Sequence, residues 1–315
     1  MGRLRIFPTS TKLSGDILCP PDKSFSHRAA MIGAIAQGET NIENFSFCQD
    51  TWSTLNCLKF LGVEIETFTE KNRVKIFSQG WKGLREPQDI LDVGNSGTTL
   101  RMLAGITASI EGLSIFTGDH SIRRRPMMRI IDPLKKTGIV IGGRGQDRYA
   151  PIYLIGKNPL RSFKHRLEIP SAQVKSCLLF AALRGDGTSY IEEPILSRDH
   201  TETMLKAVGA RIEKHNMTIQ VDPGTELEAV SFHLPGDVSS AAFLVATVLM
   251  IYGSHLTIRN IGFNPTRIGM IECIKRMGGN IIQLNEVEEW GELRGDLIVE
   301  YSQLNPFEIN QQDIP

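Results

Sequence analysis

Residues 21–42 read PDKSFSHRAAMIGAIAQGETNI and contain the pattern that decides the fold. A cluster of polar and small residues leads into an apolar stretch with helical spacing, and Gly38 then begins a run typical of a strand. The separation between the start of the cluster and the glycine is identical in four copies of this pattern. The copies start at Pro21, Asn95, Pro170 and Gly236, and their glycines are Gly38, Gly112, Gly187 and Gly253. Equal spacing in four places predicts a repeated helix–strand unit.

Each copy continues into a second helix, whose expected start carries residues that cap helices. These starts are Asp50-Thr51, Arg125-Pro126, Asp199-His-Thr-Glu202 with capping-box spacing, and Asn264-Pro265. Each of these helices is expected to end at a glycine in the left-handed conformation, followed by an alternating strand. The four glycines are Gly62, Gly138, Gly209 and Gly278. The repeat is therefore helix, strand, helix, strand, with a further strand before the next copy.

The terminal glycines give the length of the repeat, because their positions along the chain are almost evenly spaced. The period is about 70 residues, so the chain of 315 residues contains about four and a half repeats. Residues 305–315 fall where a fifth opening helix would begin. A half repeat leaves an apolar face uncovered, so we expect this chain to stop short of a completed architecture.

Composition places the chain among ordinary globular proteins, with 41% apolar and 22% charged residues. The length predicts two domains. Lys and Arg together number 35, as do Asp and Glu. Nucleic-acid and acidic-membrane binders normally carry a basic excess, so this balance argues against both kinds of partner.

Cysteine usage and targeting signals predict a cytoplasmic protein. The five cysteines are widely spread without a CxxC pair, which indicates neither a disulfide framework nor a zinc motif. The N-terminal residues lack the apolar core of a signal peptide. The most apolar run, residues 241–252, is too short to span a bilayer and is interpreted as a buried helix.

The helix starts are the expected location of the chemistry, because a helix N-terminus offers free N–H groups and a positive dipole end to an anion. Residues 20–28 add Lys23 at the start of the helix and Arg28 about one turn further on. Residues 93–101, VGNSGTTLR, add glycines and hydroxyls. They lack the lysine of a Walker loop and the full dinucleotide fingerprint, so neither ATP nor NAD is indicated. No cofactor is expected.

Other segments allow two interpretations each. Arg123-Arg124-Arg125 is either an exposed turn, which charge alone favours, or a clamp for phosphate or carboxylate. Residues 170–176 either offer donors to sugar-like hydroxyls or simply start a helix, and Asp237 is better explained as an N-cap. The seven histidines show no HxxxH or HExxH spacing, so no metal site is expected. Several anion-suited helix starts together indicate a substrate with more than one negative group.

At these same residues the chain resembles the 5-enolpyruvylshikimate-3-phosphate synthase family. The matching segments run in family order over residues 20–279 and are highly specific in combination. They are PPDKSFSHRAA, DVGNSGTTLRMLAG, TGDHSIRRRPMMRIIDPLKKTG, PSAQVKSCLLFAALRGDGTSYIEEPILSRDHTETML, PGDVSSAAF and NPTRIGMI. One departure is Pro21, where the family usually has glycine.

The resemblance implies a fold of two inverse α/β barrels, each built from three βαβαββ units, with the chain crossing twice between them. Residues 19–230 would form one complete three-unit domain. Residues 1–18 together with 231–315 would form the second domain, which would be C-terminally incomplete.

The resemblance also implies the function: transfer of the enolpyruvyl group from phosphoenolpyruvate to the 5-hydroxyl of shikimate-3-phosphate, with release of phosphate. Both substrates would be the small-molecule partners of a chain expected to be a monomer. The implied contacts to shikimate-3-phosphate are Lys23, Ser24, Arg28, Ser171, Gln173 and Ser197. Those to phosphoenolpyruvate are Lys23, Gly97 and Arg125, and Lys23 is the implied catalytic residue.

The catalytic aspartate and glutamate of the family have no match in these residues. Asp313 is interpreted as lying just before the position of that aspartate, without a catalytic role. We therefore expect this chain to bind its substrates weakly and to turn over negligibly. One rival is a non-catalytic binding module with the same fold. Another is the UDP-N-acetylglucosamine enolpyruvyl transferase family, disfavoured because residues 118–126 lack that family's reactive cysteine.

Overall fold

The structure is a computed structural model that describes residues 11–309. Within that range, eight α-helices and sixteen β-strands follow one another along the chain. The helices are α1 (Lys23–Ile35), α2 (Gln49–Phe60), α3 (Gly97–Thr107), α4 (Met128–Lys136), α5 (Ala172–Ala182), α6 (His200–Ala207), α7 (Val238–Met250) and α8 (Gly269–Arg276).

The strands are short, and most are separated by helices or tight turns. They are β1 (Ser14–Leu18), β2 (Gln37–Glu43), β3 (Glu64–Phe68), β4 (Arg73–Gln79), β5 (Leu91–Asp92), β6 (Gly112–Thr117), β7 (Val140–Arg144), β8 (Tyr149–Gly156), β9 (Lys164–Arg166), β10 (Ser189–Glu192), β11 (Arg211–His215), β12 (Thr218–Asp222), β13 (Phe232–His233), β14 (His255–Gly262), β15 (Asn280–Glu289) and β16 (Glu292–Glu300).

The strands of residues 11–309 form four sheets of one topology. Their strand orders are β13-β2-β4-β3, β5-β6-β8-β7, β9-β10-β12-β11 and β1-β14-β16-β15. In each sheet the first two strands are parallel and the third strand pairs antiparallel with the second. In the three sheets that end in β3, β7 and β11, the fourth strand is antiparallel as well. Parallel neighbours need a crossover connection, whereas antiparallel neighbours can be joined by a hairpin. The shared strand order confirms the repeated unit that the sequence spacing predicts.

Two of the sheets take their parallel edge strand from a distant part of the sequence. β13 pairs with β2, and β1 pairs with β14 over Ser14↔His255 to Leu18↔Arg259. Contacts divide the chain into two units. The three-repeat unit comprises Pro21–Leu234 and the turn Glu289–Glu292, and the single-repeat unit comprises the other described residues, 11–20, 235–288 and 293–309. The completeness of either domain stays a prediction.

The four clusters predicted to start helices do so, because a side chain in each accepts a hydrogen bond from a backbone N–H of the first turn. The capping residues are Asp22 of α1, Ser96 of α3, Ser171 of α5 and Asp237 of α7. The N-cap interpretation of Asp237 is thereby confirmed. Gly62, Gly138, Gly209 and Gly278 all have positive φ, from +85° to +96°, which confirms the predicted helix ends.

The predicted starts of the second helices are less accurate. α2 is capped by Cys48 and Thr51 rather than opened by Asp50. Asp199 precedes α6 without a side-chain capping bond. Asn264 does not cap α8, because its side chain accepts bonds from Thr266 in a turn and the helix starts later, at Gly269. Turn-forming and helix-capping side chains use the same local hydrogen bonds, so sequence alone confuses them.

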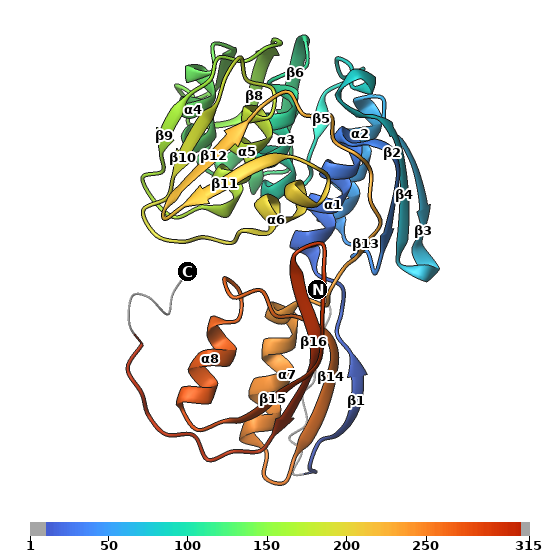
Figure 1. The fold of residues 1–315 in the computed structure, drawn as a ribbon, viewed down its shortest axis with the longest axis vertical. Helices are drawn as coiled ribbons and strands as arrows, with labels where there is room; N and C mark the ends of the chain where they lie inside the picture. The colour runs from blue at the N-terminus through green and yellow to red at the C-terminus, as the bar shows by residue number, and fades with distance from the viewer. Residues whose placement is uncertain (1–10, 310–315) are drawn as a thin grey trace. The chain divides into compact units, whose positions relative to one another are not determined.

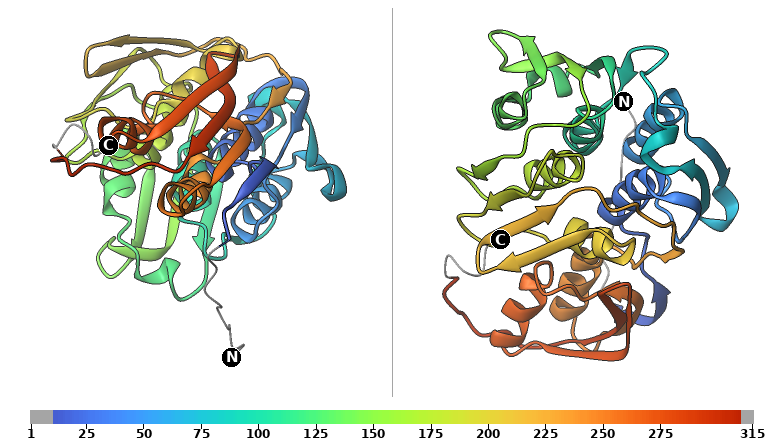
Figure 2. Two further views of the ribbon diagram at one scale, coloured as in Figure 1. Left: turned by 90° about the horizontal axis from the view of Figure 1, so that it is seen from below. Right: turned by 45° about the horizontal axis from the view of Figure 1, so that its top comes forward.

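The core of the three-repeat unit lies between its helices and its three sheets. Figure 2 shows α1, α3 and α5 inside this unit and the sheets around them. α5 is buried throughout from Val174 to Ala182. α3 approaches α5 so closely that a Cβ on Gly105 would lie 2.0 Å from the carbonyl oxygen of Cys177. Only glycine permits this approach between the two helices.

The single-repeat unit has one sheet, with α7 and α8 on the same face of it (Figure 1). The prediction of a buried helix at residues 241–252 is wrong in part. α7 forms there, but Phe243 is 79% exposed and Met250 is 73% exposed. One sheet covers only one face of a helix that is apolar on all sides. Among the described residues, no helix has the length and apolar character needed to cross a membrane.

Candidate active site

Lys23 is the first residue of α1, where the helix dipole and free N–H groups favour anions. Its ammonium lies 2.8 Å from Asp50 Oδ2, and the Lys23 side chain is 47% exposed. An ion pair this exposed contributes little to stability. The Lys23 charge is therefore accessible to a ligand at the start of α1.

Arg28 lies one turn further along α1 and is only 3% exposed. Its Nε donates to Thr201 Oγ1 at 2.7 Å, and another guanidinium nitrogen donates to the Ser24 carbonyl at 3.0 Å. A third donates to Ser176 Oγ at 3.4 Å. Arg28 thus connects α1 with α5 and α6. It holds these helices together whether or not it also contacts a ligand.

The start of α3 brings two guanidinium groups together. A Cβ on Gly97 would lie 2.8 Å from a terminal nitrogen of Arg101 and 2.8 Å from one of Arg125. The missing side chain therefore makes room for both cations. Arg123, Arg124 and Arg125 are all exposed, as the turn interpretation predicts, and Arg125 in addition extends a terminal nitrogen to Gly97 at the start of α3, a position that a clamp would use.

The electrostatics of this position favour an anion. Burial lowers the pKa of Arg101, and the charges of Arg125 and Arg129 lower it further. Three like charges close to one helix N-terminus repel one another in the absence of a ligand. A carboxylate or phosphate placed among them relieves that repulsion and accepts hydrogen bonds from the guanidinium groups.

Gln173, in the first turn of α5, joins this group of cations. Its Oε1 accepts from Arg101 at 2.8 Å, and its Nε2 donates to Thr98 Oγ1 at 3.0 Å. Ser171 caps the same helix by accepting from the N–H of Val174 at 3.4 Å. Gly97, Arg125 and Gln173 are thus three predicted site residues that the fold brings together.

Ser197 belongs to a buried group around Lys175. The Lys175 side chain is fully buried, and its ammonium lies 3.0 Å from Glu193 and 2.8 Å from Glu202. It also donates to the Ser197 carbonyl at 3.2 Å. Burial raises the pKa of Glu202, against the opposing influence of Lys175. Glu202 contacts Lys175 and has no direct bond to Ser197 in the described residues.

The first two turns of α5 connect all these groups. Gln173 contacts the start of α3, Lys175 contacts the Ser197 segment, and Ser176 contacts Arg28 of α1. The start of α1 is linked to α3 through Asp50, whose carbonyl accepts from Thr99 Oγ1 at 3.3 Å. The helix starts of the three repeats therefore meet in one site within the three-repeat unit.

A buried hydrogen-bond chain fixes the same helix starts from inside. His27 Nδ1 lies 2.7 Å from Thr54 Oγ1, which lies 2.7 Å from Thr99 Oγ1. Thr99 Oγ1 in turn lies 2.7 Å from Ser96 Oγ. Burial lowers the pKa of His27 to about 3, so this imidazole is neutral at neutral pH.

The sequence-based prediction missed Arg101, Arg129, Lys175 and Glu193. The signal for Arg101 was present, because a residue four positions after Gly97 lies on the same face of a helix. Lys175 could be recognised only as a cation inside the apolar stretch of residues 174–182. Its partner Glu193 is on a different element, so spacing along the chain gives no signal.

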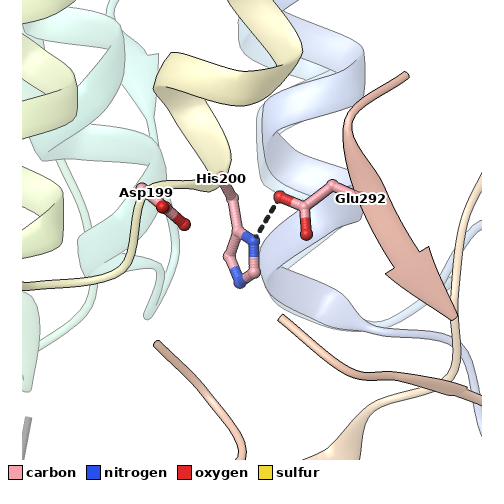
Figure 3. A group of neighbouring side chains, drawn as sticks. All are labelled: Asp199, His200 and Glu292. Atoms are coloured by element: carbon pink, nitrogen blue, oxygen red, sulfur yellow. Dashed lines mark hydrogen bonds and ion pairs between the residues drawn. The ribbon is translucent and has the colours of Figure 1, made fainter. Parts of the chain in front are cut away.

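The structure also groups Asp199, His200 and Glu292, whose side-chain ligand atoms lie within 4.8 Å of one another. Figure 3 shows His200 between the two carboxylates, with its Nδ1 2.8 Å from Glu292. The His200 ring also packs against Phe25, with centroids 4.1 Å apart. Spacing could not reveal this group, because Glu292 lies 92 positions after His200. The His200–Glu292 contact fixes the turn Glu289–Glu292 to α6.

The predicted absence of a catalytic role for Asp313 is not tested, because Asp313 lies outside the described residues.

Comparison with known proteins gives matches to one family. The family model described as EPSP synthase (3-phosphoshikimate 1-carboxyvinyltransferase) matches residues 8–315. A 3-phosphoshikimate 1-carboxyvinyltransferase of Carboxydothermus hydrogenoformans is 46% identical over 303 residues, which are 96% of this chain and 70% of that protein. One of Brevibacillus brevis is 43% identical over 304 residues, 96% of this chain and 71% of that protein.

A solved structure of EPSP synthase from Acinetobacter baumannii superimposes with a TM-score of 0.91 at 35% identity. The match covers 98% of this chain and 69% of that chain. The predicted fold class, the enolpyruvyl transferase fold of repeated α/β units, is thereby confirmed. The family match over nearly the whole sequence, the high identity to both relatives and the shared fold lead to one conclusion: the chain belongs to the EPSP synthase family of transferases.

Proposed function

We propose that this chain binds phosphoenolpyruvate and shikimate-3-phosphate and serves the transfer of the enolpyruvyl group between them. The observation that carries the proposal is the start of α3, where Gly97 makes room for Arg101 and Arg125. Two guanidinium groups at a helix N-terminus suit a small ligand that carries both a phosphate and a carboxylate. Phosphoenolpyruvate is such a ligand.

The neighbouring helix starts suit a phosphorylated polyol. Lys23 supplies an accessible cation at α1, and Ser171 and Gln173 supply neutral groups at α5. Ser24, Arg28 and Ser197 lie on the segments connected to these starts. In the reaction implied for the family, the 5-hydroxyl of shikimate-3-phosphate attacks C2 of the enolpyruvyl group while C3 is protonated. The tetrahedral intermediate then loses phosphate together with a proton from C3, which restores the double bond. Fixed cations stabilise the phosphate and carboxylate charges throughout such a reaction.

Calorimetric titration of the 315-residue chain with shikimate-3-phosphate tests the binding step. Lys23→Gln removes the cation at α1 and should raise the dissociation constant about tenfold, the size of one charge-assisted hydrogen bond. Lys59→Gln is the matched control, because Lys59 lies in the last turn of α2. If the unchanged chain gives no binding heat, or if both variants bind equally well, the proposal is wrong.

Other properties stay predictions. Negligible turnover by these 315 residues is measured by phosphate release with both substrates present. A cytoplasmic location is supported by the five cysteines, all of which lie in the described residues and form no disulfide there. A monomer is proposed for the oligomeric state, and light scattering measures it.

A further inference from the structure

Ser197 is held by a single carboxylate oxygen. Glu193 Oε1 accepts a hydrogen bond from the Ser197 N–H at 3.1 Å and a second, short one from the Ser197 hydroxyl. Glu193 is 1% exposed and Ser197 is 5% exposed. Two bonds to one atom fix both the backbone and the side-chain torsion of the serine, whose hydroxyl otherwise has several staggered positions.

The charge of Glu193 is balanced inside the protein. Its second oxygen, Oε2, lies 3.0 Å from the fully buried ammonium of Lys175. Lys175 also donates to the Ser197 carbonyl at 3.2 Å, so the lysine and the glutamate hold the serine from both sides. A buried carboxylate is costly unless it is paired in this way.

The third charged group, Glu202, has a different relation to the serine. It lies 2.8 Å from Lys175, whereas both bonds from Ser197 go to Glu193. Burial raises the pKa of Glu202, against the opposing influence of the Lys175 charge. Glu202 therefore resembles Glu193 in burial and in its partner, and differs from it in not contacting the serine.

We propose that Glu193, neutralised by Lys175, is a positioning residue that holds Ser197 in the orientation needed to contact shikimate-3-phosphate. This inference rests on the proposed function, in which Ser197 contacts that substrate. Glu193 itself is enclosed by Lys175 and Ser197 and does not touch the ligand. It acts on the affinity for shikimate-3-phosphate through Ser197 and has no effect on the site of phosphoenolpyruvate at α3.

The test compares Glu193→Gln with Glu202→Gln in the 315-residue chain by calorimetry. Glu193→Gln places an amide where Ser197 and Lys175 both donate, so the dissociation constant for shikimate-3-phosphate should rise about tenfold. Glu202→Gln removes the charge of a carboxylate that Ser197 does not contact and leaves both serine bonds to Glu193 intact, so the constant should stay within about twofold. Binding of phosphoenolpyruvate should be the same in both variants.

A double-mutant cycle separates positioning from general destabilisation. If Glu193 acts through Ser197, the variant Glu193→Gln/Ser197→Ala should bind shikimate-3-phosphate no more weakly than Ser197→Ala alone. Additive losses, or equal losses in Glu193→Gln and Glu202→Gln, would overturn the positioning role while the proposed function stands. No binding by the unchanged chain would overturn both.

A measurement on the unchanged chain covers the case in which Glu193→Gln does not fold. The Ser197 amide bonds to Glu193 before any ligand is present, so its hydrogen exchange should already be slow in the free protein. Exchange at the rate of an unprotected amide would contradict the proposal.

Discussion

Helices α5 and α7 occupy the same place in their repeats but differ in burial. Both begin after a capping side chain, and both are rich in apolar residues. α5 packs against α3, α4 and α6 and is buried throughout from Val174 to Ala182. α7 packs on β14, and of its large apolar residues Phe243 and Met250 are exposed.

The difference shows that one repeat cannot bury its own leading helix. Its sheet covers one face, and the other faces need helices from neighbouring repeats. In the three-repeat unit those contacts also build the site, because Gln173, Lys175 and Ser176 of α5 each contact another repeat or segment. Burial and function in this unit therefore depend on the same helix contacts.

The largest expected effect comes from removing one aromatic ring from each helix. Phe180 of α5 is fully buried, so Phe180→Ala should lower the free energy of unfolding of the three-repeat unit by about 3–5 kcal/mol. Phe243 of α7 is 79% exposed, so Phe243→Ala should change stability by less than about 0.5 kcal/mol. Urea unfolding followed by circular dichroism measures both. Equal losses would mean that α7 is covered in solution.

The next effect concerns the contact between α3 and α5. Gly105→Ala places a methyl group 2.0 Å from the backbone oxygen of Cys177, which can yield only if the helices separate. We expect a loss of about 3 kcal/mol in the free energy of unfolding. The control is Gly15→Ala in β1, where the nearest atom would be an ordinary 3.9 Å away. A small effect of Gly105→Ala would show that the two helices are packed more loosely than the structure has them.

Sequence patterns that span a few residues predicted the local structure of this molecule, whereas contacts between segments far apart in the sequence were not predicted. Capping residues and terminal glycines act within a few positions of one another, so the first helix of each repeat and the repeat itself were predictable. The role of the helix starts as anion sites stays a prediction. Asn264 was misread because a turn uses the same bonds as a cap. The burial of α5 but not α7, the Lys175–Glu193 pair and the His200–Glu292 contact depend on segments that meet only in the fold.

A third prediction uses the buried His27, which belongs to the three-repeat unit. The folded state keeps His27 neutral with a pKa of about 3, whereas the unfolded chain takes up a proton near the ordinary value of 6.5. The unfolded state therefore binds more protons between these values, and stability is lost as the pH falls from 6.5 toward 3. The expected slope is about 1.4 kcal/mol per pH unit.

Unfolding measured between about pH 7 and pH 5 tests the contribution of His27. His27→Gln should make the pH dependence of the three-repeat unit shallower, while His215→Gln, at an exposed histidine, should leave it unchanged. The single-repeat unit should show little dependence in this range. An undiminished slope in His27→Gln would assign the effect to another group, such as His165, whose pKa burial also lowers.

The smallest expected effect distinguishes the start of α3 from that of α7. At α7, Arg267 lies 3.0 Å from the carboxylate of its own N-cap, Asp237, which reduces the positive charge available to a ligand. At α3, Arg101 contacts the Gln173 amide, and the other charges acting on it are those of Arg125 and Arg129.

Arg125→Gln should therefore weaken phosphoenolpyruvate binding in the presence of shikimate-3-phosphate by about tenfold. Arg124→Gln changes the same charge in the exposed turn and should leave the affinity within about twofold. Equal losses of affinity in the two variants would mean that the positive potential of the whole turn attracts the ligand. The position of Arg125 beside Gly97 would then give it no special role in binding.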